Sequence, residues 1–299
     1  MERNIKATVL TQATLEQFLR KEMGLTKRQI SRAKYREKGI CGNGIRSRVT
    51  AVLKPGDQVT VLLEEEGLES AQLVPGSGEL RILYEDEDIL AADKPPGLVV
   101  HPSHGHYEDS LSNIAAAYFR KKGISVRIRP VGRLDKDTSG IVLFAKNQVA
   151  AARLSEQKKS GEFRKEYLAL IQGIPDPCKG TVSTALMKDP ESLMKMKTAE
   201  NGLRAVTHYE VLQVYEAYSL VRVFIETGRT HQIRVHMASI GHPLLGDILY
   251  GTDRRMERTA LHAAGCCFRQ PFTKKEIQLY AELPEDMKTM TASERTVTS

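Results

Sequence analysis

The stretch "GRLDKDTSGIVLFAKN", residues 132–147, joins a polar turn to an unbroken apolar run. Glycine, aspartate and serine are typical of turns, and the run "IVLF" is typical of a buried strand. Arg133 and Asp135 lie two positions apart within the turn. The pattern therefore predicts a rigid strand that carries a guanidinium and a carboxylate at its beginning.

The composition of the chain is that of an ordinary globular protein. Hydrophobic residues make up 41% of its 299 residues and charged residues 27%, which suffices for a large core and a second, small domain. No apolar run approaches the roughly 20 residues that span a bilayer, and the first ten residues lack the apolar segment of a signal peptide. We therefore expect a cytoplasmic protein without a membrane partner.

Neither the cysteines nor the histidines have the spacing of a metal site. The four cysteines contain no Cys-x-x-Cys pair, and adjacent Cys266 and Cys267 are expected to be buried apolar residues. His231 and His236 are five positions apart, which is a poor spacing for two ligands on one helical face. The glycine-rich loops of nucleotide-binding proteins are also missing from the sequence. We expect neither a metal nor a cofactor.

Positive charge is concentrated at the N-terminus. Residues 1–63 contain 13 Lys or Arg and 5 Asp or Glu, so the remainder of this chain of net charge +7 is close to neutral. Two helices are predicted here, at residues 14–24 and 26–39. Each begins with a threonine that is followed three residues later by a glutamine, the pattern of a capping box.

The second of these helices has a cationic edge. Arg28, Arg32 and Arg36 recur every four residues, Lys27 and Lys34 flank them, and few acidic residues offset these charges. A solvated helix face is the alternative interpretation, but such faces normally mix positive and negative side chains. We therefore predict that this edge binds RNA or DNA phosphates.

The order of elements in this region is similar to that of a known RNA-binding domain. After the two helices, the turns "CGNG" and "KPGD" indicate a small hairpin. The arrangement resembles the αL domain of ribosomal protein S-four and of many RNA-modifying enzymes. This resemblance places an RNA-binding domain at residues 12–65. The acidic, glycine- and proline-containing segment 66–79 is expected to be a linker.

The rest of the chain alternates strands and helices without a regular βαβ rhythm, which favours an α+β fold with a mixed, mostly antiparallel sheet flanked by helices. In "ETGRTHQIRVHMASIGHP", residues 226–243, Thr230 is predicted to cap a helix that reaches Ile240 and is ended by Gly241. Arg229 is expected at the end of the preceding strand.

Four segments together resemble the RluA-type pseudouridine synthases. They are "LAADKPPGLVVHP" (90–102), "GRLDKDTSGIVLFAKN", "KEYLAL" (165–170) and "ETGRTHQIRVHMASIGHPLLGD" (226–247). The family usually has a histidine where this chain has Gly132. The resemblance implies a catalytic domain at residues 80–285, followed by a tail at 286–299 that we expect to be disordered. It also implies a cofactor-free isomerase that converts uridine to pseudouridine in RNA, with large-subunit ribosomal RNA favoured and transfer RNA as the alternative.

The same resemblance implies a role for each candidate residue. Asp135 is the catalytic carboxylate, as nucleophile or base, and Arg229 is its ionic partner. Tyr167 stacks on the flipped uracil and assists proton removal, Arg133 braces the vacated space in the RNA, and Ile233 lines the base pocket. Without the resemblance, these residues would be interpreted as turn, core or ion-pair residues. A non-catalytic RNA-binding protein and a carboxylate-dependent nucleoside hydrolase remain as alternatives.

Overall fold

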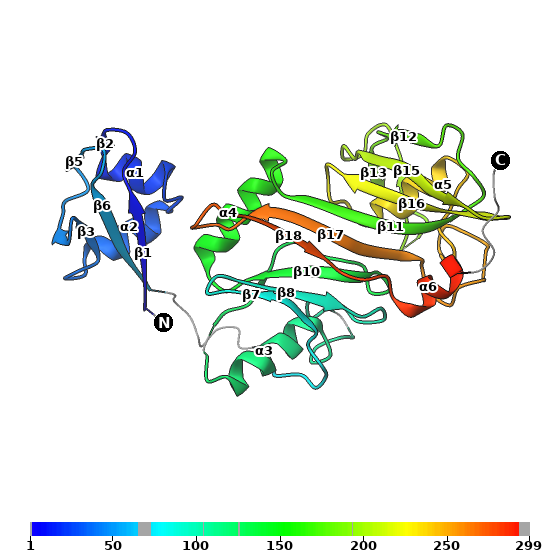
Figure 1. Cartoon of the computed structure of the whole chain (residues 1–299), viewed down its shortest axis with the longest axis horizontal. Coiled ribbons are helices and arrows are strands. Elements are labelled where there is room, and N and C mark those ends of the chain that lie inside the picture. The colour runs from blue at the N-terminus through cyan, green and yellow to red at the C-terminus, as the bar shows by residue number, and fades with distance from the viewer. Residues whose placement is uncertain (1, 65–72, 104, 125, 193, 293–299) are drawn as a thin grey trace.

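The computed structural model describes residues 2–64, 73–103, 105–124, 126–192 and 194–292 (Figure 1). They form a small N-terminal domain and a larger domain built around a long sheet, which lies beside the small domain in Figure 1. No helix of the described residues has the length and apolar character needed to cross a membrane.

The N-terminal domain packs two capped helices against a small sheet. In each helix, the threonine hydroxyl before the first turn accepts a hydrogen bond from the backbone N–H of the glutamine three residues later. This confirms both capping boxes. The helices are α1 (Leu15–Lys21) and α2 (Lys27–Lys34), and the sheet has the order β1-β6-β3-β4. Its strands are β1 (Glu2–Thr8), β6 (Gln58–Glu64), β3 (Ile40–Gly42) and β4 (Ile45–Arg46).

Two features of this domain differ from the prediction. Strand β1 pairs with β6 along its whole length, so the domain begins near residue 2 rather than at residue 12. The strands on either side of the "KPGD" turn do not pair with each other. Instead β5 (Val52–Leu53) pairs with β2 (Ala13–Thr14), and the hairpin of the domain is β3–β4.

The large domain has a ten-stranded sheet with the order β12-β15-β16-β11-β17-β10-β8-β7, to which β18 and β9 add at β17 and β10. Among the described strands only β10 and β17 pair in parallel, which confirms the predicted mostly antiparallel α+β fold. The strands are β7 (Ile82–Glu85), β8 (Ile89–Lys94), β9 (Arg129–Pro130), β10 (Ser139–Ala145), β11 (Arg164–Gln172), β12 (Lys179–Val182), β15 (Thr207–Val214), β16 (Tyr218–Ile225), β17 (Leu261–Arg269) and β18 (Glu276–Tyr280).

Within the described residues, four helices accompany this sheet, with a separate hairpin of β13 (Leu186–Lys188) and β14 (Met196–Thr198). The helices are α3 (Leu111–Lys121), α4 (Gln148–Ser160), α5 (Gln232–Ser239) and α6 (Glu285–Ala292). Strand β10 is buried along all of its residues. Val142 and Phe144 face the core that includes α3, whereas Ile141, Leu143 and Ala145 face the core that includes α4. The apolar run of the opening motif is therefore covered on both faces, which fixes the turn before it.

The chain on either side of the predicted catalytic domain is more ordered than expected. Helix α6 covers the first part of the predicted disordered tail, where Met287 is buried and the Tyr218 hydroxyl donates a hydrogen bond of 2.8 Å to the Met290 carbonyl. Residues 293–299 lie outside the described residues, as do residues 66–72 of the predicted linker. The second part of that linker lies against α3, because the Asn113 amide donates to the Val74 carbonyl at 2.7 Å.

Helix α4 connects the two domains. Val149 is buried in the core of the N-terminal domain, and Phe272 packs against the same core. The Arg153 guanidinium donates to the Met23 carbonyl in the small domain and to the Pro271 carbonyl in the large one, the latter at 2.8 Å. These contacts join the predicted RNA-binding domain directly to the helix that follows β10.

Candidate active site

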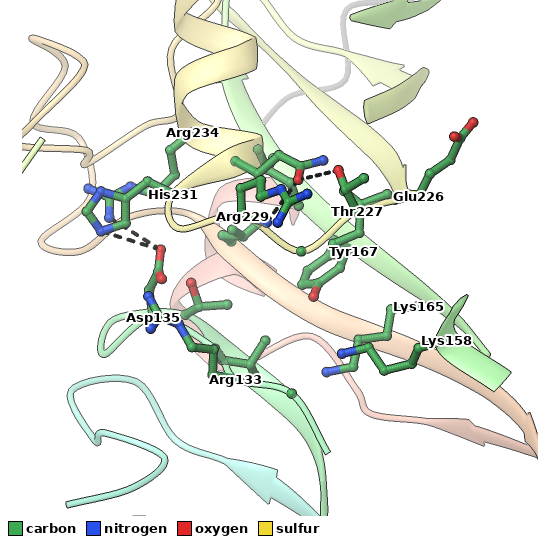
Figure 2. Close-up of a pocket in the computed structure, with 18 of the residues that line it drawn as sticks. Arg133, Asp135, Lys158, Lys165, Tyr167, Glu226, Thr227, Arg229, His231 and Arg234 are labelled. Atoms are coloured by element: carbon green, nitrogen blue, oxygen red, sulfur yellow. Dashed lines mark hydrogen bonds and ion pairs between the residues drawn. The ribbon is translucent and has the colours of Figure 1, made fainter. Parts of the chain in front are cut away.

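Three of the four motif segments meet at a cavity of about 180 Å³ between the turn before β10, strand β11 and the start of α5 (Figure 2). Its charged and aromatic lining is dominated by cations. The side chains on which its chemistry depends are Arg133, Asp135, Lys158, Lys165, Tyr167, Arg229, His231, Ile233 and Arg234.

A buried lysine fixes the turn that carries Asp135. Lys94, at the end of β8, is completely buried, and its ammonium group donates three hydrogen bonds to backbone carbonyls. The acceptors are Pro95 (2.9 Å), Leu98 (2.7 Å) and Lys136 (2.8 Å). Because one acceptor directly follows Asp135, the segment "DKPPG" holds the turn in place from the neighbouring strand.

Asp135 lies between a guanidinium and an imidazole. Its Oδ2 is 3.4 Å from Arg234 Nη1 and 3.9 Å from His231 Nε2, and its side chain is 22% exposed. Figure 2 shows both partners approaching from the start of α5. The Asp135 carboxylate is therefore partly open to the cavity and faces a guanidinium and an imidazole from one helix end.

Arg234 is held by a second, fully buried carboxylate. Its guanidinium forms a bidentate pair with Asp247, through Nε to Oδ2 at 2.7 Å and Nη2 to Oδ1 at 2.8 Å. The backbone amides of Leu249 and Tyr250 also donate to Asp247. Burial would raise the pKa of Asp247, but its hydrogen bonds with Arg234 bring that pKa below its ordinary value. Arg234 therefore approaches Asp135 in a single, fixed orientation.

The prediction that Arg229 is the ionic partner of Asp135 was wrong. Arg229 lines the cavity, but its guanidinium donates to the Arg204 carbonyl at 3.1 Å and forms no ion pair with Asp135. The reason is the position of helix α5. Arg229 lies in the loop before the helix, whereas Arg234 lies in its first turn and faces the loop of Asp135.

Helix α5 also begins later than predicted. Its N-cap is His231, which has a φ of 54° and makes no capping hydrogen bond with its side chain, and the helix ends at Ser239. The predicted cap, Thr230, instead accepts a hydrogen bond of 2.8 Å from Arg133 Nη2. This contact ties the turn before β10 to the start of α5 and holds Arg133 at the mouth of the cavity.

The two histidines of this motif have different surroundings. His236 is buried, with hydrogen bonds to Thr207 and the Thr184 carbonyl, as expected for a structural histidine. His231 contacts the Tyr250 hydroxyl at 2.9 Å and faces Asp135. Burial lowers the pKa of His231, against the opposing effect of Asp135. No cluster of three potential His, Cys, Asp or Glu metal ligands occurs among the described residues.

Tyr167 and Ile233 form the apolar wall of the cavity. Both are at least 95% buried and belong to the same hydrophobic core, so each is a core residue and a cavity residue at once. The Tyr167 hydroxyl points into the cavity (Figure 2). Burial, followed by the charge of Asp135, raises the pKa of Tyr167 above its ordinary value. The phenol is therefore protonated in the resting site.

The predicted cationic edge lines a second cavity, between the two domains. Arg28, Arg32 and Arg36 lie on one side of it, and Arg127 and Arg129 of the large domain lie on the other. Lys27 and Lys34 are exposed on the same helix but do not line this cavity. The structure thus adds two arginines from the larger domain, which the sequence did not connect with this edge.

The cavity residues that were not predicted as site residues include Lys158, Lys165, His231 and Arg234. The signal for Arg234 was its place in the first turn of the predicted helix. Lys158 and Lys165 had no signal of this kind, because they lie at the end of one element and the start of the next.

The large domain thus combines a mostly antiparallel sheet with a cation-rich cavity in which Asp135 pairs with Arg234. A family model described as RNA pseudouridylate synthase matches residues 88–239. An RNA pseudouridine synthase of Bacillus subtilis (strain 168), YjbO, is 38% identical over 267 residues, 89% of this chain and 94% of its own length. Ribosomal large subunit pseudouridine synthase D of Zymomonas mobilis is 40% identical over 224 residues, 70% of each chain.

Among solved structures, human RNA Pseudouridylate Synthase Domain Containing 1 superimposes with a TM-score of 0.58 and 26% identity, over 74% of this chain and 86% of its own. The chain therefore belongs to the RNA pseudouridylate synthase family. It is an isomerase of uridine in RNA.

Proposed function

We propose that this enzyme modifies uridines of large-subunit ribosomal RNA without a cofactor and with Asp135 as its catalytic carboxylate. The reaction breaks the bond from C1′ to N1 of uridine, joins C1′ to C5, releases the C5 proton and leaves N1 protonated, with no net redox change. The observation that carries the proposal is the Asp135–Arg234 ion pair, which lies open to a cavity walled by Tyr167. The choice of RNA follows relatives that are named as ribosomal large subunit pseudouridine synthases; transfer RNA is the second candidate.

In this proposal the uridine leaves the RNA stack and enters the cavity, which costs a few kcal/mol. Asp135 attacks or deprotonates the ribose while Arg234 balances its charge. Tyr167 stacks on the uracil, and its hydroxyl relays the C5 proton. Arg133, held by Thr230 at the mouth of the cavity, fills the space left in the RNA.

Tritium release tests the proposal directly. Large-subunit ribosomal RNA transcribed in vitro with [5-³H]uridine should lose label to water with the wild-type enzyme. A hydrolase would release free uracil, and a binding protein would do neither. Labelled transfer RNA, assayed in parallel, distinguishes the two candidate substrates.

Asp135→Asn keeps the size of the side chain and removes its charge. We expect this variant to release no tritium while it still binds the RNA in a filter-binding assay, because the carboxylate is needed for the chemistry and not for phosphate contacts. Full release by the variant would refute the role of Asp135.

A further inference from the structure

Two ammonium groups enter the active-site cavity on the side away from the Asp135–Arg234 pair (Figure 2). Lys158 comes from the last turn of α4 and Lys165 from the start of β11. A β-carbon built on Gly132, in the turn that carries Asp135, would lie 3.0 Å from Lys158 Nζ. Lys165 Nζ donates a hydrogen bond of 3.2 Å to the Ile141 carbonyl, in β10. Both groups are therefore placed against the motif that carries the chemistry.

Neither ammonium group has a carboxylate partner among the described residues. The two carboxylates that line the cavity are engaged elsewhere: Asp135 faces Arg234, and Glu226 pairs with Arg204 at 2.9 Å and with His208 at 3.1 Å. By contrast, Lys159, the neighbour of Lys158, has a carboxylate partner, because it forms an exposed ion pair with Glu156 at 3.2 Å.

The surroundings of the two lysines disfavour their charges. Lys158 is an exposed residue, and the partial desolvation of its ammonium group at the cavity lowers its pKa. Burial lowers the pKa of Lys165 to about 8, against an opposing effect of Cys266 and with a smaller contribution from the charge of Lys158. Two like charges in a partly dehydrated cavity repel each other, which costs free energy. An anion bound between them offsets that cost. Among the described residues, Lys165 uses one of its three N–H donors in the bond to the Ile141 carbonyl, so donors remain for such an anion.

We propose that Lys158 and Lys165 together bind a phosphodiester group of the RNA strand, next to the uridine that enters the cavity. The proposal rests on the proposed function and extends it, since it assigns a backbone contact to a wall of the same cavity. The phosphodiester is the anion that every RNA brings to this cavity, at a fixed distance from the reacting ribose. The two lysines would position the strand and take no part in bond breaking.

The test compares Lys158→Gln with Lys159→Gln. Both changes remove one charge from α4, but Lys159 points to its partner Glu156 and does not line the cavity. Tritium release from [5-³H]uridine-labelled large-subunit ribosomal RNA is measured under single-turnover conditions, with enzyme in excess at several concentrations and several KCl concentrations. This design separates the enzyme concentration for half-maximal rate from the maximal rate itself.

For Lys158→Gln we expect the half-saturating concentration to rise about tenfold, with a maximal rate close to that of the wild type. The salt slope of log affinity should fall by about 0.7, the value for one lost phosphate contact on a single strand. Lys158→Arg should restore both, and Lys159→Gln should match the wild type. Lys165→Gln should show the same rise in half-saturating concentration and the same fall in salt slope. If the Lys165→Gln variant does not fold, the Lys158→Gln variant alone decides the test.

Two results would overturn the proposal. Identical behaviour of the Lys158→Gln and Lys159→Gln variants would show that the cavity lysine contacts no phosphate. A lower maximal rate with an unchanged half-saturating concentration and salt slope would place Lys158 in the chemical step instead. If the wild type releases no tritium, the proposed function fails on its own. Filter binding of the same RNA by the same variants then still decides whether the lysine pair binds phosphate.

Discussion

Arg229 and Arg234 lie five positions apart in one motif, yet only Arg234 contacts Asp135. The difference arises because Arg234 is fixed from behind by the buried carboxylate of Asp247, whereas Arg229 is exposed and anchored to a backbone carbonyl. Mutations at the two positions should therefore have different consequences for stability as well as for activity.

Arg234→Gln leaves Asp247 buried without its cation, which should lower the free energy of unfolding by about 3–5 kcal/mol. Arg229→Gln loses one hydrogen bond at an exposed position and should change the free energy of unfolding by about 0.5 kcal/mol or less. Urea denaturation monitored by circular dichroism measures both. Equal effects would mean that the Arg234–Asp247 pair does not fix this side of the cavity.

Tyr167→Phe separates the ring from the hydroxyl. The variant retains the stacking surface, so RNA affinity should stay within about twofold of the wild type, while the single-turnover rate should fall at least about 100-fold if the hydroxyl relays the proton. Because burial raises the pKa of Tyr167, the wild-type rate should show no increase from phenol ionisation up to about pH 9. An unchanged rate in Tyr167→Phe would restrict Tyr167 to stacking.

Among the elements, the end of β8 holds the loop of Asp135 in place, although it belongs to a different segment of the chain. Lys94 donates all three of its hydrogen bonds to carbonyls of two loops, one of which carries Asp135. Strand β10, buried on both faces, provides the rigid base of the same loop. The turn is thus held from its own strand and from the neighbouring one.

Lys94→Met should fill the same space but leave three carbonyls without their donor. We expect the free energy of unfolding to fall by about 2–4 kcal/mol and the rate of tritium release to fall with it, because Asp135 loses its fixed position. Lys136→Met is the matched control, since the exposed Lys136 side chain does not enter this network. A Lys94→Met variant as stable as the control would contradict this role.

At the level of the whole molecule, α4 joins the two domains and contributes Gln148 to the cavity between the domains and Lys158 to the active-site cavity. The resemblance of the N-terminal domain to αL domains supports a role in RNA binding, and the arginines of both domains at the shared cavity support it independently. We propose that this cavity tracks the RNA backbone outside the active site.

Replacing Arg28, Arg32 and Arg36 with glutamine should weaken RNA binding. The salt slope should fall by about 2 if these arginines contact three phosphates of a single strand. The matched control carries the same charge change on exposed residues of that domain that lie outside the cavity, namely Arg20, Lys21 and Lys54. Filter binding across KCl concentrations measures both slopes, and equal slopes would exclude a specific role for Arg28, Arg32 and Arg36.

The sequence by itself determined the elements and the position of the motifs, because these depend on local interactions. The capping boxes of α1 and α2, the buried strand β10 and the turn with Asp135 all follow from side chains a few residues apart. The four segments also sufficed to identify the family, since their order in the chain is independent of packing.

Only the tertiary structure decided which of these residues meet. It placed Arg234 rather than Arg229 beside Asp135, brought Lys158 and Lys165 into the cavity, paired β5 with β2 and docked α6 on the large domain. Each of these outcomes depends on contacts between residues far apart in the chain. Such contacts are set by how whole elements pack, and a local pattern does not encode which way a side chain at the edge of an element will face.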